Sequence, residues 1–320
     1  MTSFVALMLA AAAVVALATS ALSGAVLASV RLERLTPAAQ SRLLLALALL
    51  PAFATCAALL AALAPSFGWI ADHCEGAVDP HNHPHICAAH HVASVPAMTV
   101  ILLGALLAGR VSFGVLRTAR AGFAAALLRR ELERLSGGRG LGSAHILPLE
   151  EPQALSVGLI RAAVFVSEGL VSGDHRQHLE PVLAHEHAHA RRLHSLRRLL
   201  AGMGLAFHLP GIAGAIERRL ARAHEMQADA DAASLVGADR VATAVVRLAR
   251  VRSTALRGAL GFGGSDVEAR VETLLDPGIR RDQPGARLLL ALAGAIGVVF
   301  GIGADSVHHG LEMMLGLLGG

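Results

Sequence analysis

The chain has 320 residues, of which 54% are hydrophobic and only 16% are charged, so its composition is too apolar for an ordinary soluble protein. Lys is absent, and the small net charge of +4 reflects Arg residues that lie next to apolar runs. With only 3% aromatic residues, this distribution argues against direct nucleic-acid binding and favours a protein embedded in a lipid bilayer.

Four apolar runs approach the length of about 20 residues that crosses a bilayer. The first, 4–30, has no Arg before it and exceeds the roughly 7–15 residues of a signal-peptide core, so we expect an uncleaved span, with a cleaved signal peptide as the alternative. The others are 43–63, 92–116 and 288–304. The sequence therefore predicts a mainly α integral membrane protein with about four transmembrane helices.

Arg placement predicts the orientation of these spans. Arg residues lie between the first two spans and after the third, at Arg31, Arg34, Arg42, Arg117, Arg120, Arg129, Arg130 and Arg134. The connection 66–91 has none. We therefore expect a multi-pass protein of the inner (plasma) membrane, with the three-span region 1–116 carrying an external loop at 66–91. Segment 117–287 is then a cytoplasmic domain, and the tail 305–320 is external.

Segment 117–287 reads as a soluble-type α+β domain between the third and fourth spans. Residues 117–135 predict an Arg-rich amphipathic helix that continues the third span, and 136–143 is a Gly-rich linker. Short β-like pieces follow at 146–149 and 162–167, and helical patterns dominate from Glu180 onward.

The apolar stretch 199–216 is interrupted by His208 and Pro210. It is shorter than a full span, so it predicts either a segment at the membrane surface or a buried core helix with a break.

The sequence His185-Glu186-His187-Ala188-His189 contains the pattern HExxH. On a helix, His185 and His189 share a face and can offer two imidazoles to one zinc ion, and Glu186 can act as the base for a zinc-bound water. A chance match has to be weighed in a chain with 17 His. Pro181 at a helix start and the flanking apolar residues favour a functional motif.

A catalytic zinc needs a third protein ligand and an open position. Glu225 and Asp229 would share a helix face, so Glu225 can complete a two-His, one-Glu site. Asp229 can accept the outer N–H of a ligating His, which fixes its tautomer. His224 is a competing third ligand, and a solvated acidic helix face is the alternative without function.

His185 to His189, followed by Glu225-x-x-Ala228-Asp229, resembles the motif pair of gluzincin metallopeptidases of the HtpX/Ste24 and BlaR/MecR types. Segments 151–158 and 163–170 are similar to the stretch before HExxH in both groups, where a β-strand can pair with the substrate backbone. Segment 270–275 resembles a late R[VI]xxLL segment. Three spans before the motif and one after are similar to the BlaR/MecR layout.

This resemblance implies a zincin-like domain with one catalytic Zn²⁺ held by His185, His189 and Glu225, and with Glu186 as catalytic base. It implies an endopeptidase with a protein substrate, such as a cytoplasmic transcriptional repressor of the BlaI/MecI type. The alternatives are an HtpX/Ste24-like quality-control protease and a non-enzymatic membrane metal sensor. The intact Glu186 disfavours the sensor, because a structural zinc site needs no general base.

The chain departs from the resembled pattern at three points. An Asp is common five residues after the second His, where this chain has His194. The penicillin-binding sensor domain of the β-lactam sensors has no counterpart in the tail 305–320, so we do not expect β-lactam sensing. The chain has no Tyr, so His208, His224 or an Arg would have to polarise the scissile carbonyl.

The external loop 66–91 is rich in metal-binding side chains, and Cys56 is expected to be a filler within its span. The candidates in the loop are Cys74, Cys87, His81, His83 and His85. They predict a metal site or a disulfide that gates the protease, with a passive polar connector as the alternative.

Overall fold

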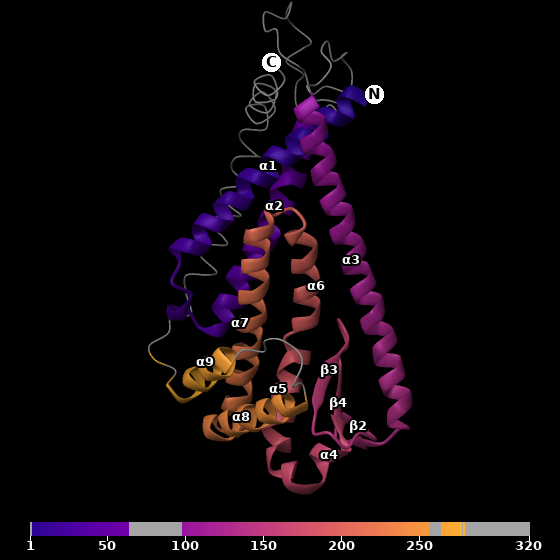
Figure 1. Ribbon diagram of the computed structural model, residues 1–320, viewed down its shortest axis with the longest axis vertical. Helices are drawn as coiled ribbons and strands as arrows, with labels where there is room; N and C mark the ends of the chain where they lie inside the picture. The colour runs from indigo at the N-terminus through magenta and orange to yellow at the C-terminus, as the bar shows by residue number, and fades with distance from the viewer. Residues whose placement is uncertain (1, 64–97, 256–263, 277, 279–320) are drawn as a thin grey trace, which may run out of the picture.

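The computed structural model describes residues 2–63, 98–255, 264–276 and 278 of the chain. Over these residues the protein is mostly helical and contains one small mixed sheet (Figure 1). The predicted fourth span 288–304, the external loop 66–91 and the tail 305–320 lie outside the described residues.

Three long helices correspond to the first three predicted spans: α1 (Thr2–Ser29), α2 (Pro37–Leu63) and α3 (Met98–Ser136). Within the described residues, each holds a stretch long and apolar enough to cross a membrane. The 39 residues of α3 extend for about 58 Å, twice the roughly 30 Å of a hydrocarbon core. The helix is therefore long enough to extend beyond a hydrocarbon core; it is continuous through 117–135, as predicted, and leads directly to the sheet.

The sheet has four strands in the order β1-β2-β4-β3: β1 (Gly140–Leu141), β2 (Ala144–Leu147), β3 (Ala154–Val157) and β4 (Ala163–Ser167). Strands β2 and β4 are parallel and the other pairs are antiparallel. The predicted pieces 146–149 and 162–167 overlap β2 and β4. The prediction missed β3, and it assigned β1 to the linker 136–143.

The remaining elements follow the sheet in chain order, with a 3-10 turn, η1 (Leu32–Arg34), between α1 and α2. They are α4 (Glu168–Val171), the 3-10 segment η4 (Gly173–His178), α5 (Leu179–Arg191), α6 (His194–Leu205), α7 (Pro210–Val236), α8 (Ala238–Ala255) and α9 (Gly264–Leu275). Pro210 opens α7, where its missing N–H needs no partner.

Helices α6 and α7 form a hairpin that packs against α1 and α2 (Figure 1). One apolar core joins the four helices, and its buried members include Leu27, Leu44, Leu47, Leu205, Ile216 and Leu220. The apolar stretch 199–216 therefore has the break that was predicted, and Ala201, Leu205 and Ile216 within it are buried, whereas contact with the membrane surface stays a prediction. The hairpin ties the domain to the candidate membrane helices.

His208 lies in the turn of this hairpin and is only 1% exposed. Its Nε2 lies 3.0 Å from the carbonyl oxygen of Leu47, its Nδ1 lies 3.3 Å from Ser20 Oγ, and its own carbonyl accepts a hydrogen bond from Arg110 Nη2. In an apolar surrounding, polar backbone groups need such partners. His208 thus joins α6–α7 to α1, α2 and α3, and it takes no part in the cluster described below.

The hairpin lies very close to α2 at Gly204. A Cβ at this position would lie 2.2 Å from the carbonyl oxygen of Ala48, whereas a Cβ at Gly211 would meet nothing within 4 Å. We expect Gly204→Ala to destabilise the fold by about 1–3 kcal/mol through overpacking, and Gly211→Ala to have little effect. Thermal unfolding of both variants in detergent tests this, and equal midpoints would refute the close packing.

Candidate metal centre

Helix α5 presents His185 and His189 on one face, and their Nε2 atoms lie 3.0 Å apart. Helix α7 supplies Glu225, whose Oε1 lies 3.5 Å from His189 Nε2 and whose Oε2 lies 3.7 Å from His185 Nε2. Within the described parts of the chain, these three residues form the group of His and acidic side chains whose ligand atoms converge closely enough to hold one metal ion.

Small side chains bring α5 and α7 together at this point. Ala188 on α5 and Ala228 and Ala232 on α7 are fully buried. Short side chains allow two helix backbones to approach closely, which brings the longer His and Glu side chains within reach of one another. The Ala-rich sequence around both motifs is thus part of how the site is assembled.

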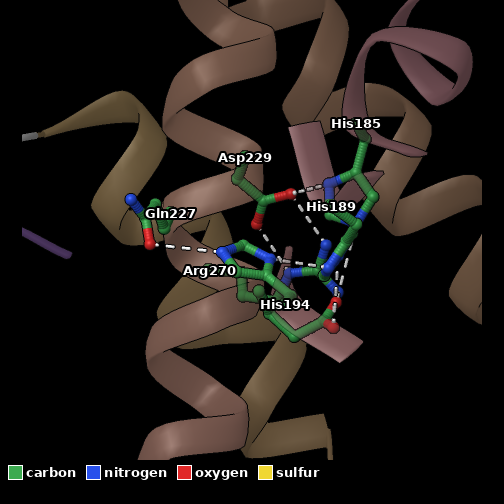
Figure 2. Close-up of polar contacts among 7 residues, drawn as sticks. His185, His189, His194, Gln227, Asp229 and Arg270 are labelled. Carbon is green, nitrogen blue, oxygen red and sulfur yellow. Dashed lines mark hydrogen bonds and ion pairs between the residues drawn. The ribbon is translucent and has the colours of Figure 1, made fainter. Parts of the chain in front are cut away.

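Asp229 and Arg270 contact the candidate ligands and hold them in place (Figure 2). Asp229 Oδ1 lies 2.8 Å from His185 Nδ1, and its carboxylate, only 2% exposed, accepts two hydrogen bonds of 2.7 Å from Arg270 on α9. Arg270 Nη1 also lies 3.2 Å from Glu225 Oε2. One guanidinium therefore joins the carboxylate that orients His185 to the carboxylate that faces both His residues.

The other His is contacted by His194, at the start of α6. Its Nδ1 lies 2.8 Å from His189 Nδ1, and its Nε2 lies 3.2 Å from Gln227 Oε1. The ring of His194 stacks on that of His224, with centroids 4.2 Å apart and an interplanar angle of 8°.

The charge around the cluster favours a cation. Burial by itself lowers the pKa of His185, but its hydrogen bonds with Asp229 and Glu225 raise it to about 9. Burial raises the pKa of Asp229, yet Arg270 and His185 bring it below its ordinary value. The pKa of Glu225 is lowered in the same way, against burial, by both His residues and Arg270. Two ionised carboxylates thus surround the His pair.

The neighbouring imidazoles of His189, His194 and His224 are neutral near pH 7, because their pKa values are lowered. Burial, followed by the charge of His185, lowers the pKa of His189 to about 3. Burial lowers the pKa of His194 to about 4, and burial with the charge of His194 lowers that of His224 to about 3. A neutral imidazole offers one nitrogen lone pair, which is the form that binds a metal.

The geometry fits a zinc ion. Ligand atoms at about 2.0–2.1 Å in a tetrahedron are separated by roughly 3.3 Å, close to the 3.0, 3.5 and 3.7 Å between the converging atoms. The Nδ1 atoms of both His residues are engaged by Asp229 and His194, so each Nε2 is left for the metal. The Glu225 side chain is 40% exposed, so the cluster is accessible to solvent at this carboxylate.

The structure brings His185, His189, Glu225 and Asp229 into one cluster. Glu186 follows His185 on α5, and its charge acts on both His185 and Arg270. His224, the competing third ligand, is turned away: it stacks on the far side of His194, and neither of its buried ring nitrogens has a hydrogen-bond partner among the described residues. The candidates Cys74, Cys87, His81, His83 and His85 lie outside the described residues, whereas Cys56 is exposed on α2.

Three residues of the cluster were not predicted in their roles: Arg270, His194 and Gln227. Arg270 opens the R[VI]xxLL-like segment 270–275, and it contacts Glu225, which makes it a candidate for the Arg that polarises a carbonyl. His194 occupies the position at which the resembled pattern has Asp, and this was the signal for its role. No sequence signal pointed to Gln227.

Asp229→Asn is expected to lower zinc affinity about 10–100-fold, as removal of an orienting partner commonly does. The reason is that an Asn side chain lacks the negative charge with which Asp229 attracts Arg270 and His185. Asp231→Asn is the matched control, because Asp231 lies two residues after Asp229 on the same helix and also accepts hydrogen bonds from an Arg, but its partner is Arg192. Titration with a competing chelator measures both variants, and equal affinities would contradict this role of Asp229.

Residues 128–218 match the model of peptidase family M48, a family of metal-dependent peptidases. The match covers less than a third of the chain, from the end of α3 into α7. It includes His185, Glu186 and His189 and ends before Glu225. It supports a metallopeptidase, and assignment to the BlaR/MecR type stays a prediction. No curated protein and no solved structure matches the chain.

Proposed function

We propose that the chain is a membrane-embedded zinc endopeptidase with its active site on the cytoplasmic side. The observation that carries the proposal is the convergence of His185, His189 and Glu225, with Glu186 beside them on α5. Bound by these three residues, zinc would supply a Lewis acid that polarises a carbonyl and makes water more acidic.

Glu186 is the proton carrier in this proposal. Its carboxylate takes a proton from the attacking water and returns it to the amine nitrogen that leaves when the peptide bond breaks. Asp229 orients His185, and Arg270 holds Asp229 and Glu225 in place. The contact of Arg270 with Glu225 also puts it within reach of a carbonyl bound at the solvent-accessible side of the cluster.

Strand β3 supports an extended protein substrate. Among the described residues it lies at the end of the strand order, pairs with β4 along one edge only and contacts α5. An unpaired strand edge can hydrogen-bond to the backbone of an extended peptide. A segment bound along β3 could extend beyond the cluster in both directions, which favours cleavage within a chain over removal of terminal residues.

The position of the cluster supports a cytoplasmic substrate close to the bilayer. Arg219 on α7 donates a hydrogen bond to the carbonyl of Leu27, near the end of α1 that the Arg distribution predicts to be cytoplasmic. Glu225 lies six residues further along α7, or about 9 Å. A cytoplasmic repressor of the BlaI/MecI type is the substrate that we propose, on the resemblance in motif and layout.

A substrate trap tests the proposal. Glu186→Gln is expressed in cells beside the parent, crosslinked and purified, and the captured proteins are identified. We expect enrichment of a cytoplasmic protein, including a transcriptional repressor, that the parent cuts at an internal bond. Capture restricted to extracytoplasmic proteins would contradict the orientation, and removal of terminal residues alone would contradict an endopeptidase.

A further inference from the structure

His194 contacts the outer nitrogen of a candidate metal ligand without reaching the metal position itself. It is 2% exposed, and it connects His189 Nδ1, at 2.8 Å, to Gln227 Oε1, at 3.2 Å (Figure 2). His185, by contrast, is held by the Asp229 carboxylate and Arg270. The two candidate His ligands therefore have supports of different chemistry, one charged and one without a carboxylate.

The hydrogen bonds of His194 can run in only one direction if His189 is to bind a metal. The amide oxygen of Gln227 only accepts, so His194 Nε2 carries a proton and His194 Nδ1 is left as an acceptor. The proton between the two Nδ1 atoms then belongs to His189. His189 Nε2 keeps its lone pair, and this is the atom that faces His185 and Glu225.

The backbone places His194 for this contact. Leu193, between α5 and α6, has a left-handed conformation with φ 54°, and among the described residues it is the one non-glycine with positive φ. Left-handed backbone is unfavourable for a residue with a branched side chain, so the surrounding fold has to hold it. It reverses the chain after α5, which brings the side chain of residue 194 back over His189.

We propose that His194, oriented by Gln227, is a positioning residue that fixes the tautomer and ring orientation of His189, so that an imidazole–amide pair serves in place of a carboxylate. The inference rests on the proposed function, because it takes His189 to be a zinc ligand. It accounts for the His at the position where the resembled pattern has Asp. It also accounts for the burial of Gln227, which is 3% exposed on α7.

Substitutions of matched shape test the proposal in the full-length protein. Asn at position 194 places its side-chain oxygen where Nδ1 lies and so keeps an acceptor for His189. Gln places its polar group near the Nε2 position instead, and Leu has no hydrogen-bonding group at either position. Zinc dissociation constants, visible spectra of the cobalt-substituted protein and thermal midpoints are measured for the parent, His194→Asn, His194→Gln and His194→Leu. His187→Leu is the control, because His187 contacts Ser143 on another face of α5.

We expect His194→Leu and His194→Gln to bind zinc about 10–100-fold more weakly and to change the cobalt spectrum. His194→Asn and the control should stay within about threefold of the parent. Parental affinity in both His194→Leu and His194→Gln overturns the inference. So does an equal loss in all three position-194 variants that follows their thermal midpoints, because that pattern indicates a packing role. A folded parent that binds no zinc overturns the proposed function instead.

Discussion

Glu186→Gln is expected to lower the rate of peptide cleavage by roughly 10²–10⁴-fold, the usual contribution of a general acid–base group, and to leave zinc content unchanged. The amide keeps the size of the side chain but cannot take a proton from water. Metal binding should persist because the ligand atoms come from His185, His189 and Glu225. Cleavage of a labelled protein and metal analysis of the same sample measure both effects.

Glu180→Gln is the matched control for this substitution. Glu180 lies in the first turn of the same helix, where its exposed carboxylate pairs with Arg240 at 2.6 Å. The control should cleave at the parental rate. Full activity in Glu186→Gln would remove the proposed mechanism, and loss of zinc together with activity would make Glu186 a ligand or a structural group.

Glu225→Ala is expected to weaken zinc binding by on the order of 10²-fold or more, because loss of a ligand exceeds the roughly 10–100-fold effect of losing an orienting partner. In the parent, Arg270 Nη1 lies 3.2 Å from Glu225 Oε2. The substitution removes this carboxylate, so that it no longer offsets the positive charge of Arg270 beside the metal position. Cleavage should fall with zinc occupancy and recover in part at high zinc concentration.

Two further variants make the Glu225 result specific. Glu217→Ala removes an exposed carboxylate from the same helix, where Glu217 lies 3.8 Å from Arg117, and should bind zinc as the parent does. His224→Ala tests the competing third ligand. If Glu225→Ala kept zinc and His224→Ala lost it, the assignment of the third ligand would be wrong.

Local spacing made most of the cluster predictable. His185 and His189, and likewise Glu225 and Asp229, are four residues apart, and helix periodicity alone puts each pair on one face. Helix periodicity alone did not choose between His224 and Glu225, because each could face the His pair, depending on how the helix is turned; the resemblance favoured Glu225. The packing of α7 on α5 agrees with that choice, since it turns Glu225 toward the His pair and His224 behind His194.

The parts of the site and the fold that could not be predicted depend on contacts between segments that are distant in the sequence. Arg270 reaches Asp229 from α9, and no periodicity connects residues that far apart. The three long helices were predictable because long apolar runs with few charges indicate helices able to cross a bilayer. Their packing with α6–α7 was not, because Ala- and Leu-rich faces suit lipid and protein equally. Strand β3 was missed because Ala154-Leu-Ser-Val157 is too short to show a clear alternation.

The most direct test of the account is the metal content and metal dependence of the purified full-length protein in detergent. We predict about one zinc per chain, loss of that zinc and of protein cleavage together on treatment with a chelator, and recovery of both when zinc is added back. Folded protein that binds no zinc, or cleavage that continues unchanged after complete removal of metal, would contradict a zinc peptidase site at His185, His189 and Glu225.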